Sequence, residues 1–155
     1  MCIRRAVALG VVAGVVGAAG AASSALASTA ASGFFKTPSG KIVCGWGTGG
    51  SPSAFIECGV ATGLKPPIPK AGHPECKHLD YVGNRVGLSP TGHVQLLPCV
   101  GDAGPFADPA HTVYLHYGST KGVGSITCTV TRKGLTCRNP GGHGFFLSLR
   151  SWRTF

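Results

Sequence analysis

Acidic residues are scarce in this chain. Only five of its 155 residues are Asp or Glu, against 14 Lys and Arg. Charged residues make up 12% of the chain, where soluble domains usually have roughly 25%. Glycoside hydrolysis needs two suitably placed carboxyl groups, and five acids that fall mostly in expected loops offer few such pairs. The composition therefore argues against that class of enzyme.

The chain also lacks a motif typical of serine hydrolases and the apolar repeat typical of helical proteins. No G-x-S-x-G motif is present, which argues against the usual nucleophile elbow of serine hydrolases. No segment carries a sustained apolar repeat of helical period. The apolar segments are short and are separated by Gly, Pro and Ser clusters, which favours strands. The sequence therefore predicts a mainly β fold: a small antiparallel sheet or a compact barrel-like domain of disulfide-stapled hairpins.

The N-terminal segment has the features of an export signal. Arg4 and Arg5 provide a positive start, and an uncharged run of Ala, Val, Gly and Leu extends from residue 6 to residue 22. We expect cleavage after Ala27, with cleavage after Ala30 as the alternative. A retained anchor is disfavoured because the run is rich in Ala and Gly and shorter than the roughly 20 apolar residues of a spanning helix.

The sequence thus predicts three parts: a signal peptide (residues 1–27), a disordered leader (residues 28–33) and a single disulfide-rich β domain (residues 34–155). No later segment is apolar enough to span a membrane, so we expect a secreted or cell-wall-associated protein. We expect this protein to be monomeric and to need no cofactor.

Seven cysteines are present, and Cys2 leaves with the predicted signal peptide. An even set of six in an exported chain indicates a disulfide framework, because such bonds persist outside the reducing cytosol. Several pairings are open. We favour the sequential pairing, in which each bond closes a turn-rich stretch: Cys44–Cys58, Cys76–Cys99 and Cys128–Cys137.

The clearest local geometry surrounds residues 131–134. If these residues form a turn, Thr129 lies opposite Thr136, and Cys128 lies opposite Cys137. Opposed cysteines in a non-hydrogen-bonded antiparallel pair come close enough to bridge. The same rule applied to the first two cysteines of the domain predicts a second stapled hairpin, in which Trp46 lies opposite Ile56.

Three other segments have recognisable patterns. Alternating apolar residues predict a central strand at Thr112–Tyr117, and a late strand is expected at Phe145–Leu149. The stretch Lys65–Asp80 contains four prolines, so we expect a surface loop there, held by Cys76.

Two motif matches are weak. Gly45–Gly50 fits the dinucleotide pattern G-x-G-x-x-G, but no helix follows to face the phosphates. His73, Cys76 and His78 lie close together, yet they lack a matching pair of ligands, and Cys76 is expected in a disulfide. We therefore predict no metal site.

The basic residues gather toward the C-terminus. Without Arg4 and Arg5, 12 Lys and Arg remain against five acids, a net charge of +7, and the six basic residues from Lys121 onward accompany no acid. This asymmetry favours an anionic cell-wall polymer or an extracellular protein as partner, with Trp46 or Trp152 at the rim of the contact. Export and the absence of interleaved stacking aromatics argue against nucleic acid. The candidate binding residues are Arg132, Lys133, Arg138, His143, Arg150 and Arg153.

The leading functional hypothesis is a non-enzymatic interaction module with a basic surface. The competing hypothesis is a small secreted hydrolase that pairs His143 with Asp102 or Asp108 as acid and base. A third is a protease inhibitor that presents Arg132 as bait on a rigid hairpin tip. The positive charge can also serve solubility alone.

Three segments resemble the motifs of a known family: Phe35–Cys44 (FKTPSGKIVC), Gly134–Cys137 (GLTC) and Gly142–Ser148 (GHGFFLS). They are similar to the start and end of a secreted actinobacterial family catalogued as domain of unknown function 6636. The resemblance spans essentially the whole mature chain. It implies export, disulfides and a small domain, and it brings no activity. The family usually has Asn where this chain has Lys41, and Arg where it has Leu149.

Overall fold

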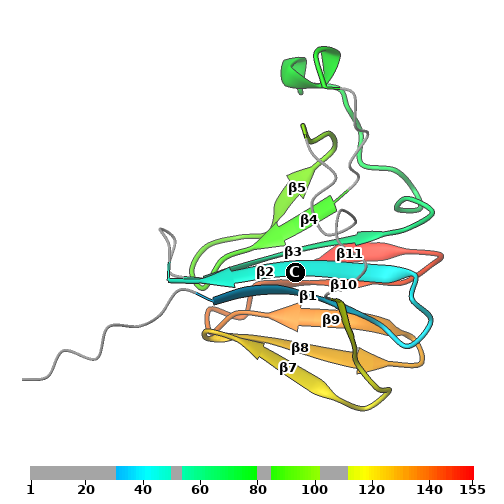
Figure 1. Cartoon of the computed structure of the whole chain (residues 1–155). Coiled ribbons are helices and arrows are strands. Elements are labelled where there is room, and N and C mark those ends of the chain that lie inside the picture. The colour runs from blue at the N-terminus through cyan, green and yellow to red at the C-terminus, as the bar shows by residue number, and fades with distance from the viewer. Residues whose placement is uncertain (1–30, 50–53, 80–84, 102–111) are drawn as a thin grey trace, which may run out of the picture.

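The computed structural model describes residues 31–49, 54–79, 85–101 and 112–155 (Figure 1). The predicted signal peptide and residues 28–30 of the predicted leader lie outside these ranges. Strand β1 begins at Ala31, three residues before the expected start of the ordered domain.

The first sheet, as far as the described residues show it, has six strands in the order β5-β4-β3-β2-β1-β6. Neighbouring strands are antiparallel apart from β1 and β6, which run parallel. The strands are β1 (Ala31–Lys36), β2 (Ile42–Thr48), β3 (Ala54–Val60), β4 (Arg85–Leu88), β5 (Gln95–Leu97) and β6 (Thr112–Tyr114).

The second sheet is a five-stranded meander in the order β11-β10-β9-β8-β7. Its strands follow one another along the chain and are joined by short turns, in which Gly124 and Gly142 have φ angles of 56° and 82° that suit glycine. The strands are β7 (Thr120–Val123), β8 (Ile126–Thr131), β9 (Gly134–Arg138), β10 (Gly144–Leu147) and β11 (Trp152–Thr154).

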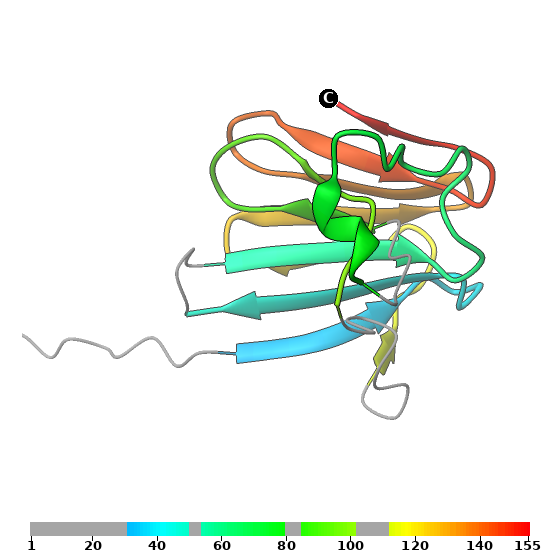
Figure 2. The same cartoon turned by 90° about the horizontal axis from the view of Figure 1, so that it is seen from above.

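The two sheets pack face to face around one hydrophobic core (Figures 1 and 2). Side chains alternate along each strand, so one set from each sheet points into the sandwich. Burying one large apolar side chain contributes about 1.5–3 kcal/mol. The predicted mainly β, antiparallel fold is confirmed, and the sheets are not closed into a barrel. Among the most buried core residues are Phe35, Ile56, Leu88, Ile126, Leu135, Phe145 and Leu147.

All three predicted disulfides are present. Two of them join directly opposed residues of neighbouring strands, Cys44 to Cys58 and Cys128 to Cys137, with Cα atoms 4.1 Å and 4.0 Å apart. These four cysteines are fully buried in the core. The predicted registers are confirmed as well, since Trp46 pairs with Ile56 and Thr129 with Thr136.

The predicted central strand at residues 112–117 is wrong. Strand β6 covers only three of these residues and forms an edge of the first sheet, where Val113 and Tyr114 are 61% and 57% exposed. The chain then turns, because the amide of Ser119 donates to the carbonyl of His116. Alternation of apolar residues alone does not distinguish an edge strand from a central one.

The expected late strand is β10, displaced by one residue at its start and two at its end. It ends at Leu147 because Ser148 begins a turn. The Ser148 hydroxyl accepts hydrogen bonds from the amides of Arg150 and Ser151.

The proline-rich stretch after β3 is a loop, as predicted. Its described part contains one short 3-10 helix, η1 (Pro74–Lys77), which the Cys76–Cys99 disulfide holds. The indole nitrogen of Trp152 donates to the Pro66 carbonyl at 2.6 Å, so the loop is also fastened to β11 of the second sheet. Leu64 and Ile68 of this loop are buried in the core.

Asn139 joins the two sheets at the end of β9. Its side-chain nitrogen donates to the carbonyls of Ser89 and Gly92, at 3.1 Å and 2.9 Å, in the connection between β4 and β5. Its side-chain oxygen accepts a hydrogen bond from the amide of His143. This buried amide is therefore satisfied as both donor and acceptor.

Candidate binding surfaces

The six predicted binding residues fall in three separate places. Two lie on the outer face of the second sheet, three in turns at one end of the sandwich, and one in the β9–β10 turn at the other end. The structure therefore does not bring them into one site. Arg138 and Arg153 lie on the outer face, and His143 lies in the β9–β10 turn. The turns at the opposite end contain Arg132, Lys133 and Arg150.

Both arginines of the outer face lie over aromatic rings. The Cζ atom of Arg138 lies 4.3 Å from the centroid of the Phe155 ring, and that of Arg153 lies 5.3 Å from the centroid of Phe146. A guanidinium that lies over a ring is attracted by the ring's π electrons, and its planar N–H donors suit bidentate contacts with carboxylate or phosphate. We call these four residues the stacked-arginine face.

Glycine at position 144 makes the Arg138–Phe155 contact possible. Gly144 is the register partner of Arg138, and its backbone exchanges two hydrogen bonds with Phe155 on the other side. A Cβ atom at this position would lie 2.7 Å from the Phe155 ring and clash with the carbonyl oxygen of Cys137. The side chains thus meet across β10 because the strand between them has none.

Threonines extend the outer face beside the arginines. Thr120, Thr129 and Thr136 lie in one row across β7, β8 and β9, and Thr127 is the register partner of Arg138. Neighbouring strands are about 4.8 Å apart, so the row places hydroxyl groups at that interval. Within the described residues, these four side chains have no hydrogen-bond partner. They are available to a polar ligand.

Within the described residues, no Asp or Glu side chain balances the charge of this face. Strands β7 to β11 contain no Asp or Glu, and no carboxylate of the described residues pairs with Arg138 or Arg153. The first sheet differs, since its buried Arg85 pairs with Glu57 on the neighbouring strand. The two outer arginines therefore keep their charge available to a partner.

The basic turns border a cavity of about 110 Å³ at one end of the sandwich. Arg132 and Lys133 line it together with Ser39 and Ser148 from two other turns. The Cζ atom of Arg132 lies 5.4 Å from the centroid of Tyr117. Arg132, Lys133 and Arg150 are all exposed. This end adds positive charge, and the use of Arg132 as protease bait stays a prediction.

His143 has a histidine as its ring neighbour. Its ring centroid lies 4.0 Å from that of His93, which belongs to the connection between β4 and β5. The aspartates of the hydrolase hypothesis, Asp102 and Asp108, lie outside the described residues. The proposed acid–base pair therefore stays a prediction.

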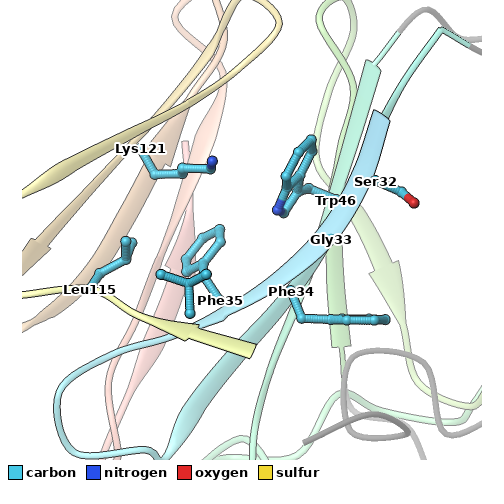
Figure 3. A pocket seen from close by; sticks show the side chains of 8 residues that line it. Ser32, Gly33, Phe34, Phe35, Trp46, Leu115 and Lys121 are labelled. Atoms are coloured by element: carbon cyan, nitrogen blue, oxygen red, sulfur yellow. The ribbon is translucent and has the colours of Figure 1, made fainter. Parts of the chain in front are cut away.

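A groove between the sheets was missed by the sequence analysis. It has a volume of about 220 Å³, and its walls include Phe35, Trp46, Leu115 and Lys121 (Figure 3). The ammonium nitrogen of Lys121 lies 4.6 Å from the centroid of a Trp46 ring. One signal was available: Trp46 stands two residues after Cys44, so both share the inward face of β2.

Comparison with known families assigns the chain. The model of a family of unknown function, DUF6636, matches residues 15–155. The chain belongs to the DUF6636 family. The match spans both sheets of the DUF6636 domain, and it brings no activity with it. No curated protein and no solved structure matches the chain. Among the described residues, no helix has the length and hydropathy needed to cross a bilayer.

Proposed function

We propose that this DUF6636 protein is a secreted, non-enzymatic binding module that holds an anionic cell-wall polymer across the stacked-arginine face. The observation that carries the proposal is the pair of guanidinium groups, Arg138 and Arg153, each fixed on a ring and each without a carboxylate partner in the described residues.

The chemistry of guanidinium supports this ligand class. Its planar N–H donors match the paired oxygens of carboxylate and phosphate, and such charge-assisted hydrogen bonds are roughly twice as strong as neutral ones. Because the rings already restrict both side chains, less conformational entropy is lost on binding. A repeating polymer offers several anions, so it can engage both arginines at once.

The threonine row supports a polymer that also carries hydroxyl groups. Thr120, Thr129 and Thr136 offer donors and acceptors on the same face as the arginines. Hydroxyls of this kind exchange hydrogen bonds readily with sugar or polyol hydroxyls. The combination favours an anionic polysaccharide or polyol phosphate over a purely apolar partner.

The disulfide content supports secretion. Three bonds lie within the described residues, two of them in the core, and such bonds persist in oxidising compartments. The predicted signal peptide provides the route of export.

Retention on immobilised polymers tests the proposal. We expect the protein to bind polygalacturonate and poly(glycerol phosphate) but not neutral dextran, and to be released between about 0.05 M and 0.5 M salt because screening weakens charge contacts. Arg138→Gln and Arg153→Gln should each weaken binding about tenfold. Arg→Lys at the same positions should recover only part of it, since lysine keeps the charge but loses the planar fork.

The matched controls are Lys65→Gln and Lys70→Gln, each of which removes one positive charge, as each arginine variant does, from an exposed position of the loop after β3. If these controls weaken binding as much as the arginine variants, net charge rather than the stacked-arginine face is responsible. Capture of an acidic extracellular protein in place of the polymers, lost in the arginine variants, would reassign the face to a protein partner.

A further inference from the structure

The groove between the sheets has the chemistry of a small-molecule site. It opens at the side of the sandwich where β1 and β6 of the first sheet lie beside β7 of the second. Figure 3 shows Trp46 and Phe35 projecting from the first sheet to the same side, with Lys121 reaching toward Trp46 from β7. Phe34 and Ser32 project to the other side of β1.

The indole of Trp46 is fixed by a glycine opposite it. Gly33 and Trp46 are register partners, and a Cβ atom on Gly33 would lie 3.1 Å from the indole ring. Because Gly33 has no side chain, the ring can lie flat against β1 and form one wall of the groove. Phe35 and Leu115 complete an apolar lining.

Two polar groups in this lining are unused by the described residues. The indole nitrogen of Trp46 has no hydrogen-bond acceptor there, in contrast to that of Trp152, which donates to the Pro66 carbonyl. Lys121 has no carboxylate partner there either, and its ammonium group is held over the Trp46 ring. Both groups are donors, and one carries a positive charge, so the complementary ligand group is an anion.

We propose that the groove binds a small aromatic carboxylate, with its ring against the apolar lining and its carboxylate between Lys121 and the indole N–H of Trp46. The volume supports a single ring: apolar cavities of about 150 Å³ accept benzene, and this groove measures about 220 Å³, which leaves space for a short acidic side chain. The site lies between the sheets, apart from the stacked-arginine face, so it is independent of the proposed polymer binding.

Nuclear magnetic resonance offers a test with an internal control. The chain has two tryptophans, so the ¹⁵N-labelled protein gives two indole N–H signals. On titration with 3-phenylpropionate we expect the Trp46 signal to move, with a dissociation constant of about 1 mM or lower, while the Trp152 signal stays. The neutral amide of the same compound should bind about tenfold more weakly, because it cannot form the charge-assisted contact.

The variant Lys121→Met keeps the length of the side chain and removes its charge, and it should also weaken binding about tenfold. Lys36→Met is the matched control, since Lys36 lies over Tyr114 and points to the outer face of the first sheet. Unchanged binding in Lys121→Met, equal loss in Lys36→Met, or no movement of the Trp46 signal would each overturn the proposal. Hexanoate binding as tightly as 3-phenylpropionate would overturn the aromatic ligand class.

The two proposals fail separately. Lys121→Met should still be retained on polygalacturonate, and the protein with Arg138→Gln and Arg153→Gln should still bind 3-phenylpropionate. A protein that binds one ligand and not the other refutes only the corresponding proposal.

Discussion

The guanidinium of Arg138 reaches the ring of Phe155 across a strand position that has no side chain. The intervening residue is Gly144, where a Cβ atom would overlap the Cys137 carbonyl and the Phe155 ring. The stack is thus a property of three neighbouring strands, and the glycine in the middle is as necessary as the two side chains.

Replacement of Gly144 by alanine should destabilise the second sheet. We expect a loss of about 2–3 kcal/mol in the free energy of unfolding, because overpacking against a backbone carbonyl forces the strands apart. Gly122→Ala is the control. Gly122 lies in β7, on the same outer face of the second sheet as Gly144, and nothing lies within 4 Å of its added Cβ atom. Chemical denaturation of both variants measures the difference, and equal stabilities would contradict the steric argument.

Replacement of Asn139 by alanine should loosen the contact between the sheets. The change removes three hydrogen bonds and leaves the carbonyls of Ser89 and Gly92 without their side-chain donor. We expect a loss of about 1–2 kcal/mol, because the buried Asn139 side chain no longer bonds the two sheets together. Ser148→Ala, which removes bonds in an exposed turn, should cost less than about 1 kcal/mol. Thermal unfolding of the two variants gives the comparison.

The Cys76–Cys99 bond should be reduced before the other two. Cys76 is half-buried and Cys99 is 7% exposed, whereas the four cysteines of the core disulfides are fully buried. Thiol–disulfide exchange requires access of the attacking thiolate. Brief treatment with dithiothreitol, alkylation and peptide mass mapping should therefore label these two cysteines first. Earlier labelling at Cys44 or Cys128 would show that the sandwich opens more readily than its packing implies.

Removal of one partner of the Glu57–Arg85 pair should cost more than removal of both. Arg85 is 1% exposed, so Glu57→Gln takes one carboxylate away from a buried guanidinium, at a cost of about 3 kcal/mol. The double variant Glu57→Gln/Arg85→Met replaces the pair with neutral side chains and should regain part of that loss. A double-mutant cycle on the free energy of unfolding measures the coupling, and strict additivity would contradict it.

The local hairpins could be predicted from sequence because the cysteines fix them. Once Cys128 faces Cys137 across a four-residue turn, every other pair of β8 and β9 follows, and the observed register agrees. The same holds for Cys44 and Cys58. The division into two sheets and the parallel contact of β1 with β6 have no such local signal, since they join residues far apart in the chain.

The binding surfaces were less predictable than the strands. Sequence reasoning identified Arg138 and Arg153 as basic, but their stacking depends on Phe146 and Phe155 on neighbouring strands. It passed over Lys121 as one charge among several. Lys121 is the register partner of the buried Cys128, so both side chains lie on the inward face of the second sheet. This can be recognised only when the pairing of β7 with β8 is known.

The disulfides all join residues that are close in sequence, and none connects residue 99 or any earlier residue to residue 128 or any later one. A single cut by a protease between residues 102 and 111 would therefore produce two unlinked polypeptides, each retaining its own sulfur bridges. They would migrate together on a native gel and separate in detergent without reductant. The two halves of the cut domain would then bind each other through the packed core, the β1–β6 ladder and the side-chain hydrogen bonds of Asn139 and Trp152.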